Sequence, residues 1–275
     1  MQQPTFPIAA GLEIPRLGFG TFLLDGDDAY RSVRTALETG YRHIDTAQGY
    51  RNEDEVGRAI ADSEVDRDDL FVTTKIKPSN AAAPEARRST EESLRQLGMD
   101  RVDLLLLHWP AEHVAPLEET LEAMMAARDD GLTRAIGVSN FPSAMLRRAY
   151  EHAPMIATDQ VEHHPFLSVA PIEAVLHEHD GFLTAYSPIA KGEVATDPTL
   201  MEIGDAHGVS ATQVTLRWML QRPAVVAIPK SGTEERIRAN FDVFGFELSD
   251  EEMARIDGLD RGYRIVDPEG SPDWD

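Results

Sequence analysis

Four side chains that could hold a charge or move a proton follow short apolar runs of the chain. Asp45, Lys75 and His108 each stand at the end of such a run, and Tyr50 follows Asp45 by five residues. A free phenol has a pKa of about 10, and a nearby ammonium group lowers that pKa. We therefore expect Lys75, held and oriented by Asp45, to turn Tyr50 into a proton donor. His108 could donate a hydrogen bond to the same oxygen site.

The later apolar runs also end in polar side chains. These side chains are Ser139 with Asn140, Gln160, Tyr186 with Ser187, and Lys230. Successive members of the series are separated by roughly 20 to 45 residues, enough for one strand and at least one helix each. In a parallel barrel the carboxyl ends of the strands meet at one face, where active sites lie. We therefore expect all of these residues at one face of the fold.

Apolar runs alternate with segments of helical apolar spacing along the whole chain. The predicted strands are 43–45, 70–75, 102–108, 135–139, 157–160, 182–187 and 225–228, with a weaker strand at 17–20. Such alternation predicts parallel β structure, and eight strands suit a (β/α)8 barrel of about 250 residues. We predict the α/β class and a single (β/α)8 TIM barrel domain over residues 1–275.

Three additions to the barrel are predicted. Residues 6–8 and 12–14 flank Ala9-Ala10-Gly11 and form an N-terminal β-hairpin that closes the barrel bottom. Residues 198–207 supply an extra helix after the seventh strand, and further helix is expected near the C-terminus. A doubly wound open sheet is the rival fold, but the pair Gly18-Phe19-Gly20 has Leu23 where a dinucleotide fingerprint needs its third glycine.

The composition limits the possible binding partners and indicates the cellular location. Lys plus Arg is 26 and Asp plus Glu is 48, which gives a net charge of −22. Such a field repels phosphate backbones and anionic lipid, so nucleic acid and membranes are poor partners. The chain shows no apolar run of signal or membrane-spanning length and no cysteine, and we expect a cytoplasmic protein. Because only Lys75, Lys77, Lys191 and Lys230 are lysines, a halophilic, high-salt cytosol is our hypothesis, with an ordinary acidic surface as the alternative.

The motifs around these residues resemble the aldo-keto reductase family, most of all its bacterial 2,5-diketo-gluconate reductase and methylglyoxal reductase group. The matching segments are 40–47 with Tyr50, Asn52 and Glu53, then 73–75, 107–110, 136–141, 160–162, 185–192, 228–231, and a tail like 268–270 to 274–275. They follow in the family's order over nearly the whole chain. The resemblance implies the barrel fold and a monomer.

The resemblance also implies roles for individual residues. Asp45, Tyr50, Lys75 and His108 match the catalytic tetrad, with Tyr50 as the proton donor. The implied cofactor is a nicotinamide dinucleotide lying over the barrel mouth. Its carboxamide would be held by Ser139, Asn140 and Gln160, its ring would stack on Tyr186, and Ser187 would also contact it. Trp109 is implied as a wall of the substrate pocket, with a core aromatic as the alternative.

A phosphate site is predicted where the last strand leads into a helix. Lys230-Ser231-Gly232-Thr233 precede that helix, whose N-terminus attracts phosphate. Arg236 and Asn240 share one helix face with Thr233. Lys230 and Arg236 would place two cations beside a ribose 2′-phosphate, which favours NADPH and leaves NADH as the second choice. A capping box from Ser231 to Glu234 is the structural alternative, and both can hold at once.

Three positions depart from the family pattern. Ala239 stands where relatives often carry Glu or Gln, and Gly232 replaces a larger residue. The segment Ile76-Lys77-Pro78 lacks the tryptophan that many members have shortly after the catalytic lysine. The pocket wall is therefore expected to be wider or more basic.

The sequence predicts NADPH-dependent reduction of aldehydes or ketones, whether small carbonyls, keto acids or keto sugars, with no metal. Other functions stay open at this point. A Schiff-base aldolase could use Lys75, and a non-catalytic nicotinamide-binding sensor or interaction subunit could use the same scaffold. A metal hydrolase would draw on His43, Asp45, His108, His163 and His164.

Overall fold

Eight parallel strands form the centre of the computed structural model, which describes residues 3–8 and 11–275. In chain order the strands are β3 (Phe19–Gly20), β4 (His43–Asp45), β5 (Phe71–Ile76), β6 (Val102–Leu107), β7 (Thr133–Ser139), β8 (Ile156–Glu162), β9 (Phe182–Tyr186) and β10 (Val225–Ala227). Neighbours in sequence are neighbours in the sheet. The predicted strands are confirmed, with ends that differ by at most two residues.

The sheet closes on itself between its first and last strands. Ala227 accepts a hydrogen bond from Gly18 N at 2.8 Å and donates one to Arg16 O at 2.9 Å, and Gly20 N donates to Pro229 O at 3.1 Å. These bonds join the segment before β3 to β10, as a barrel requires. The (β/α)8 barrel is thereby confirmed, and the open doubly wound sheet is excluded.

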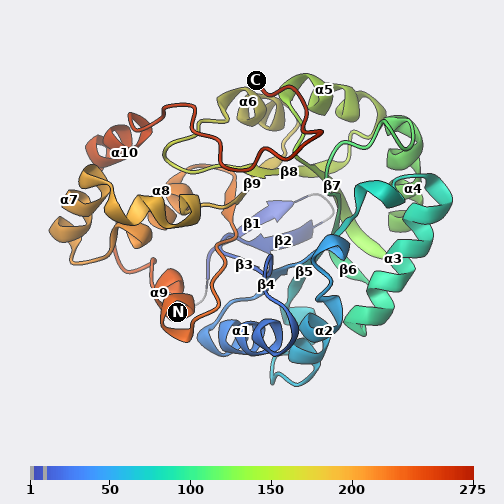
Figure 1. Ribbon diagram of the computed structural model, residues 1–275, viewed down its shortest axis with the longest axis horizontal. Helices are drawn as coiled ribbons and strands as arrows, with labels where there is room; N and C mark the ends of the chain where they lie inside the picture. The colour runs from blue at the N-terminus through green and yellow to red at the C-terminus, as the bar shows by residue number, and fades with distance from the viewer. Residues whose placement is uncertain (1–2, 9–10) are drawn as a thin grey trace.

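An antiparallel hairpin of β1 (Thr5–Ile8) and β2 (Leu12–Pro15) lies behind the barrel in Figure 1. Its apolar side chains Ile8, Leu12 and Ile14 pack with Phe71 and Phe182, the first residues of β5 and β9. The hairpin therefore covers the amino-terminal end of the barrel, as predicted. Ala9 and Ala10 of the predicted turn lie outside the described residues.

Helices surround the barrel (Figure 1). They are α1 (Gly26–Thr39), α2 (Glu53–Ala61), α3 (Ala83–Leu97), α4 (Leu117–Asp129), α5 (Ser143–His152), α6 (Ala170–Glu178), α7 (Pro198–His207), α8 (Ala211–Gln221), α9 (Glu234–Phe241) and α10 (Asp250–Asp257), with 3₁₀ turns η2 (Gln48–Tyr50), η3 (Arg67–Asp69), η4 (Pro78–Asn80) and η5 (Ala190–Thr196). In α1 the buried residues Ala29, Val33, Ala36 and Leu37 recur at helical spacing, so one face packs on the barrel.

The extra helices have clear start signals in the sequence. Asp197 caps α7 by accepting hydrogen bonds from Thr199 N and Leu200 N, and Ser210 opens α8 with a capping box. These caps separate α7 from α8 in the long connection after β9. The extra helix predicted there is confirmed, and α9 and α10 supply the helix expected near the C-terminus.

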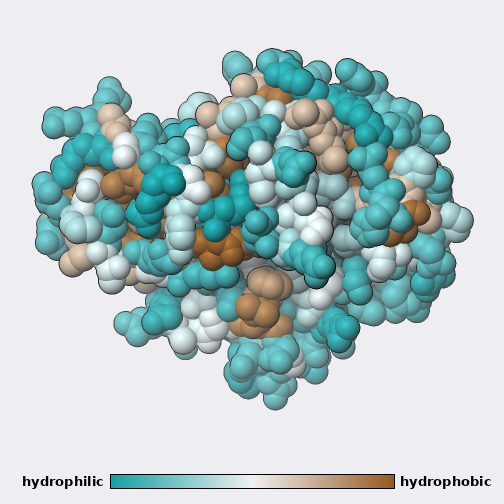
Figure 2. Space-filling view, turned by 45° about the horizontal axis from the view of Figure 1, so that its top comes forward, coloured by the Kyte–Doolittle hydropathy of each residue, from teal (hydrophilic) through white to brown (hydrophobic). Residues whose placement is uncertain are grey.

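The carboxyl-terminal tail runs across the viewer's side of the barrel, near α5 and α6 (Figure 1). Hydrophilic side chains cover most of the face seen in Figure 2, and hydrophobic ones gather near its middle. Within the described residues, no helix is long and apolar enough to cross a membrane.

Candidate active site

Lys75 and Asp45 form a buried ion pair at the carboxyl ends of neighbouring strands. Because Asp45 pairs with Thr73 in the β4–β5 register, Lys75 lies two residues further on and on the same face. Its Nζ donates to Asp45 Oδ1 at 2.5 Å and to Thr46 O at 2.8 Å. Lys75 is fully buried, and a buried ammonium needs such partners.

Tyr50 lies over this pair on the turn η2. Its hydroxyl oxygen is 3.4 Å from Lys75 Nζ, and the same Nζ is 4.9 Å from the centre of the Tyr50 ring. His108, directly after β6, meets Tyr50 edge to face with ring centres 5.4 Å apart. The structure therefore brings the four tetrad candidates of the sequence into one group, with a phenol and an imidazole facing the mouth.

Burial controls the acidity of Tyr50. It raises the pKa of the Tyr50 phenol well above 10, and the charge of Asp45 acts in the same direction. The net lowering of this pKa that we expected is therefore wrong. The Lys75 ammonium, 3.4 Å from the phenol oxygen, favours the phenolate, but the loss of water around the phenol outweighs this effect. Tyr50 consequently keeps its proton at neutral pH, as a proton donor must.

His108 is a neutral side chain in this site. Burial, followed by the charge of Lys75, lowers its pKa to about 3. Burial also lowers the pKa of Lys75, against the opposing effect of Asp45. A neutral imidazole can donate one hydrogen bond but brings no positive charge, so His108 is suited to orient an oxygen atom rather than to protonate it.

Ser139, Asn140, Gln160 and Tyr186 form a hydrogen-bonded group beside the tetrad. Ser139 Oγ donates to Gln160 O at 2.7 Å, Asn140 Nδ2 donates to His108 O at 2.9 Å, and Tyr186 Oη donates to Asn140 Oδ1 at 2.8 Å. Asn140 has a φ of 65°, which asparagine tolerates better than most residues. This backbone turn directs its side chain back towards His108.

This group fits a nicotinamide. Gln160 Nε2 donates to Asp45 Oδ2 at 2.8 Å, which fixes the amide, while Gln160 Oε1 has no partner in residues 3–8 and 11–275 and is left as an acceptor. A carboxamide also needs a donor, and Asn140 Nδ2 would supply one in place of its present bonds to His108 O at 2.9 Å and Ser139 Oγ at 3.0 Å. Tyr186 ends β9 as a half-buried ring beside the group. Ser187 follows with a φ of 48°, where the chain turns away from the strand.

The phosphate-end candidates surround the start of α9. They are Lys230, Ser231, Gly232, Thr233, Arg236 and Asn240, of which Ser231 and Asn240 are buried and the other four are exposed. The predicted capping box from Ser231 to Glu234 is wrong, because Thr233 is the N-cap and Glu234 is the first helical residue. Ser231 Oγ instead accepts from Thr233 N at 3.2 Å. Lys230 and Arg236 have no ion pair within the described residues, so both charges are available to an anion.

The tail places an aromatic side chain against Trp109, the predicted wall of the substrate pocket. Trp274 meets Trp109 edge to face at 6.3 Å between ring centres, donates from Nε1 to Asp267 Oδ1 at 3.2 Å, and lies under the Arg264 guanidinium, 3.6 Å from the ring centre. Phe22, after β3, is 53% exposed and lies 5.0 Å from the Tyr50 ring. An exposed phenylalanine directly after the first strand is the signal that could have identified Phe22.

Two anchors hold the tail in place. The first is Glu162, which ends β8 and accepts hydrogen bonds from His164 Nε2 at 2.8 Å, Ile265 N at 2.8 Å and Val266 N at 2.7 Å. The second is Asp275, whose carboxylate accepts from the backbone N and the hydroxyl of Ser143, both at 2.7 Å, at the start of α5.

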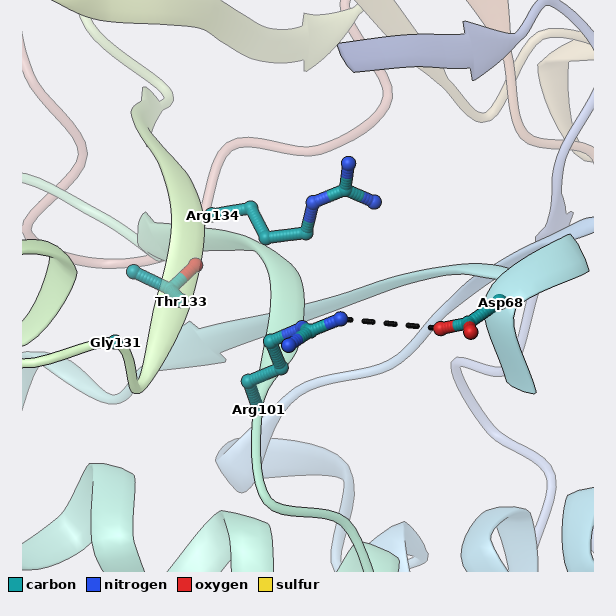
Figure 3. Close-up of a pocket in the computed structure, with 5 residues that line it drawn as sticks. All are labelled: Asp68, Arg101, Gly131, Thr133 and Arg134. Atoms are coloured by element: carbon teal, nitrogen blue, oxygen red, sulfur yellow. Dashed lines mark ion pairs between the residues drawn. The ribbon is translucent and has the colours of Figure 1, made fainter. Parts of the chain in front are cut away.

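A hollow of about 500 Å³ lies at the opposite end of the barrel. It is lined by Asp68, Arg101, Gly131, Thr133 and Arg134, which lie at or before the amino-terminal ends of the strands. Figure 3 shows Arg101 and Arg134 extending towards the same side, with Arg101 paired to Asp68 at 3.8 Å. Arg134 also pairs with buried Asp103 at 3.1 Å. These charges are largely compensated, so we assign the hollow no part in the reaction.

The rival chemistries find less support in this geometry. Among the described residues no three His, Asp or Glu side chains converge on a metal position. His43 contacts Thr73 Oγ1 at 3.1 Å, His163 contacts Leu167 O at 2.9 Å, and His164 is held by Glu162. Lys75 Nζ donates hydrogen bonds to Asp45 Oδ1 and Thr46 O, whereas a Schiff-base enzyme needs an amine that is free to attack a carbonyl carbon.

The mouth of the barrel holds a phenol bonded to a lysine, a neutral imidazole and a group suited to bind an amide. This combination is typical of barrel oxidoreductases that act on carbonyl groups. The model of the Aldo/keto reductase family matches residues 16–261. The chain belongs to this family, and it is an NAD(P)H-dependent oxidoreductase.

Individual relatives are similar to this chain over nearly its full length. The chain is 41% identical to a 2,5-diketo-D-gluconic acid reductase B of Corynebacterium sp. (strain SHS752001), with 98% of this chain and 97% of that protein covered. An aldo-keto reductase from a deep-sea metagenome library has a TM-score of 0.92 at 36% identity, covering 98% of this chain and 100% of the other. A Bombyx mori aldo-keto reductase in complex with NADP has a TM-score of 0.89 at 34% identity, covering 97% and 96%.

Proposed function

We propose that this protein reduces aldehydes or ketones to alcohols with NADPH and that Tyr50 supplies the proton. The observation that carries the proposal is the contact of Lys75 with both partners, 2.5 Å to Asp45 Oδ1 and 3.4 Å to Tyr50 Oη. An ammonium fixed beside a phenol stabilises the phenolate that remains when the proton leaves. The resemblance of these residues to the family tetrad supports the same assignment.

The tetrad residues at the mouth would have different roles at the carbonyl oxygen of the substrate. The oxygen would accept hydrogen bonds from Tyr50 Oη and from neutral His108. When bound, the nicotinamide supplies the hydride for the carbonyl carbon. As negative charge develops on the oxygen, Tyr50 transfers its proton to it. Lys75 stabilises the phenolate until solvent returns the proton.

The preference for NADPH over NADH is supported by charge. Lys230 lies before α9, and Arg236 lies in its first turn. Both side chains are exposed and form no ion pair within residues 3–8 and 11–275. Two cations on one side of a helix start suit a doubly charged phosphate. Replacing both with methionine should raise the KM for NADPH strongly and leave the KM for NADH nearly unchanged.

Tyr50→Phe is the decisive experiment. The variant should lose about 10²–10⁴-fold in kcat for aldehyde reduction, while NADPH binding, followed by quenching of tryptophan fluorescence, stays close to that of the wild type. Tyr30→Phe is the matched control, since Tyr30 Oη bonds Asp62 at 2.9 Å on the helical shell. Undiminished turnover in Tyr50→Phe would refute the proton-donor role. Tight NADPH binding with no turnover of any carbonyl would favour the sensor.

The domain organisation and the cellular setting stay predictions. We expect a single catalytic domain over residues 1–275 and a monomer in the cytoplasm of a cell with a high internal salt concentration. The net charge of −22 supports the high salt concentration, and the family resemblance supports the monomer.

A further inference from the structure

The free basic side chains of this acidic protein gather at one end of it. In the described part of the chain, most Arg and Lys side chains contact a carboxylate or a backbone carbonyl. Those that contact neither are Arg51, Lys77, Lys191, Lys230, Arg236 and Arg264. Each follows the carboxyl end of a strand or belongs to the tail that crosses the mouth. The unpaired basic side chains therefore gather at the mouth end of the barrel.

Arg264 differs from the other five because it is half-buried. Its Nη1 is shielded from solvent and has no hydrogen-bond partner among the residues described. The carboxylates of Glu162, Asp267 and Asp275 act on Arg264 through their charge, but none of them forms a hydrogen bond or ion pair with its guanidinium among the described residues, and Glu162 accepts from His164 Nε2, Ile265 N and Val266 N instead. Burial lowers the pKa of the Arg264 guanidinium, against the opposing effect of Glu162 and other nearby acids. A buried donor without a partner costs free energy, and an anion bound there would remove that cost.

The position of Arg264 relates it to the reacting atoms. Its guanidinium stacks on Trp274, Trp274 contacts Trp109, and Trp109 follows His108 in the chain. On its other side the charge of Arg264 acts on Tyr186 at the end of β9. Arg264 thus belongs to the part of the tail that contacts Trp109, the residue directly after His108. The pair Lys230 and Arg236, which we assign to the cofactor phosphate, follows β10 instead.

We infer that Arg264 binds a carboxylate of the substrate, so that the enzyme selects aldehydes and ketones that carry an acid group away from the reacting carbonyl. The inference rests on the proposed carbonyl reduction. A guanidinium stacked on an aromatic ring keeps the edge of its plane free for two parallel bonds to a carboxylate. Arg264 is a specificity-determining residue in this scheme and takes no part in the proton transfer.

The test compares two substrates that differ in one charge, 4-carboxybenzaldehyde and 4-carbamoylbenzaldehyde. The measured quantity is the ratio of their kcat/KM values with NADPH at fixed ionic strength, because salt screens the mouth as a whole. In Arg264→Met, which keeps an apolar contact with Trp274, the ratio should fall about 10–100-fold. Arg264→Lys keeps the charge and should retain part of the preference.

Arg261→Met is the matched control. Arg261 belongs to the same segment and also stacks on aromatic rings, 4.0 Å from the centre of Phe166, but it is exposed and 3.8 Å from Glu193. Its substitution should leave the ratio unchanged. An unchanged ratio in Arg264→Met, or an equal loss for both substrates, would overturn the inference, since the second result is what a purely structural contact with Trp274 gives.

A binding measurement separates failure of this inference from failure of the proposed function. Calorimetry with the NADPH-bound enzyme should show that 4-(hydroxymethyl)benzoate binds at least 10-fold more tightly than 4-(hydroxymethyl)benzamide, and that Arg264→Met removes this difference. The result does not depend on turnover. Equal binding of the two alcohols to the wild type would overturn the role of Arg264 even in an active enzyme.

Discussion

Lys75→Met tests how strongly the ion pair under Tyr50 stabilises the fold. The variant leaves Asp45 buried with a hydrogen bond from Gln160 Nε2 at 2.8 Å but without the ammonium that lies 2.5 Å away in the wild type. Removing one partner of a buried pair costs about 3–5 kcal/mol. At about 2–4 °C per kcal/mol, the Tm should fall by roughly 6–20 °C.

The double variant Asp45→Asn with Lys75→Met supplies the control. It has no buried charge left without a counterion, so its Tm should lie above that of Lys75→Met alone, although a second residue has been changed. Thermal melts followed by circular dichroism at pH 7.5 measure the effect. If the two substitutions lower the Tm additively, the pair is not coupled and our description of the site is wrong.

Three further outcomes are expected. Asp103→Asn should lower the Tm and leave kcat/KM unchanged, because buried Asp103 binds Arg67 at 2.7 Å and Arg134 at 3.1 Å at the end of the barrel opposite the mouth; a fall in kcat/KM would contradict this. Burial lowers the pKa of His43 and His163 to about 4, so the stability they contribute is complete above about pH 6.5 and is lost as the pH falls toward 4. Their ring resonances in NMR spectra should not titrate between pH 8 and pH 5. The Tm should rise from dilute buffer to about 2 M KCl because salt screens the net charge of −22; equal stability in dilute buffer would argue against a high-salt protein.

The barrel could be predicted from the sequence because its strands are covered on both faces. β6 is buried at every position and is apolar apart from Asp103, so the run stands out without any periodicity. β3 was the weakest prediction for a physical reason. It has two residues, and the barrel is closed next to it by hydrogen bonds of Gly18 and Gly20 that no side-chain pattern encodes.

The tetrad was also within reach of the sequence, since Asp45, Lys75 and His108 stand at or beside strand ends and Tyr50 follows Asp45 by five residues. The acidity of Tyr50 was not, because the loss of water around the phenol depends on packing from several elements. The positions of Trp274 and Arg264 were equally hidden. The tail has no regular structure, and Glu162 and Ser143, which hold it, are separated from it by more than a hundred residues of sequence.

The gathering of unpaired cations at the mouth makes the charge distribution of this acidic molecule uneven. On an anion-exchange matrix it should adsorb through its acidic helical shell, with the mouth turned toward the liquid and accessible to dissolved reactants. A sulfonate resin should repel the molecule as a whole, because its net charge is −22. The choice of support therefore decides whether an immobilised preparation works.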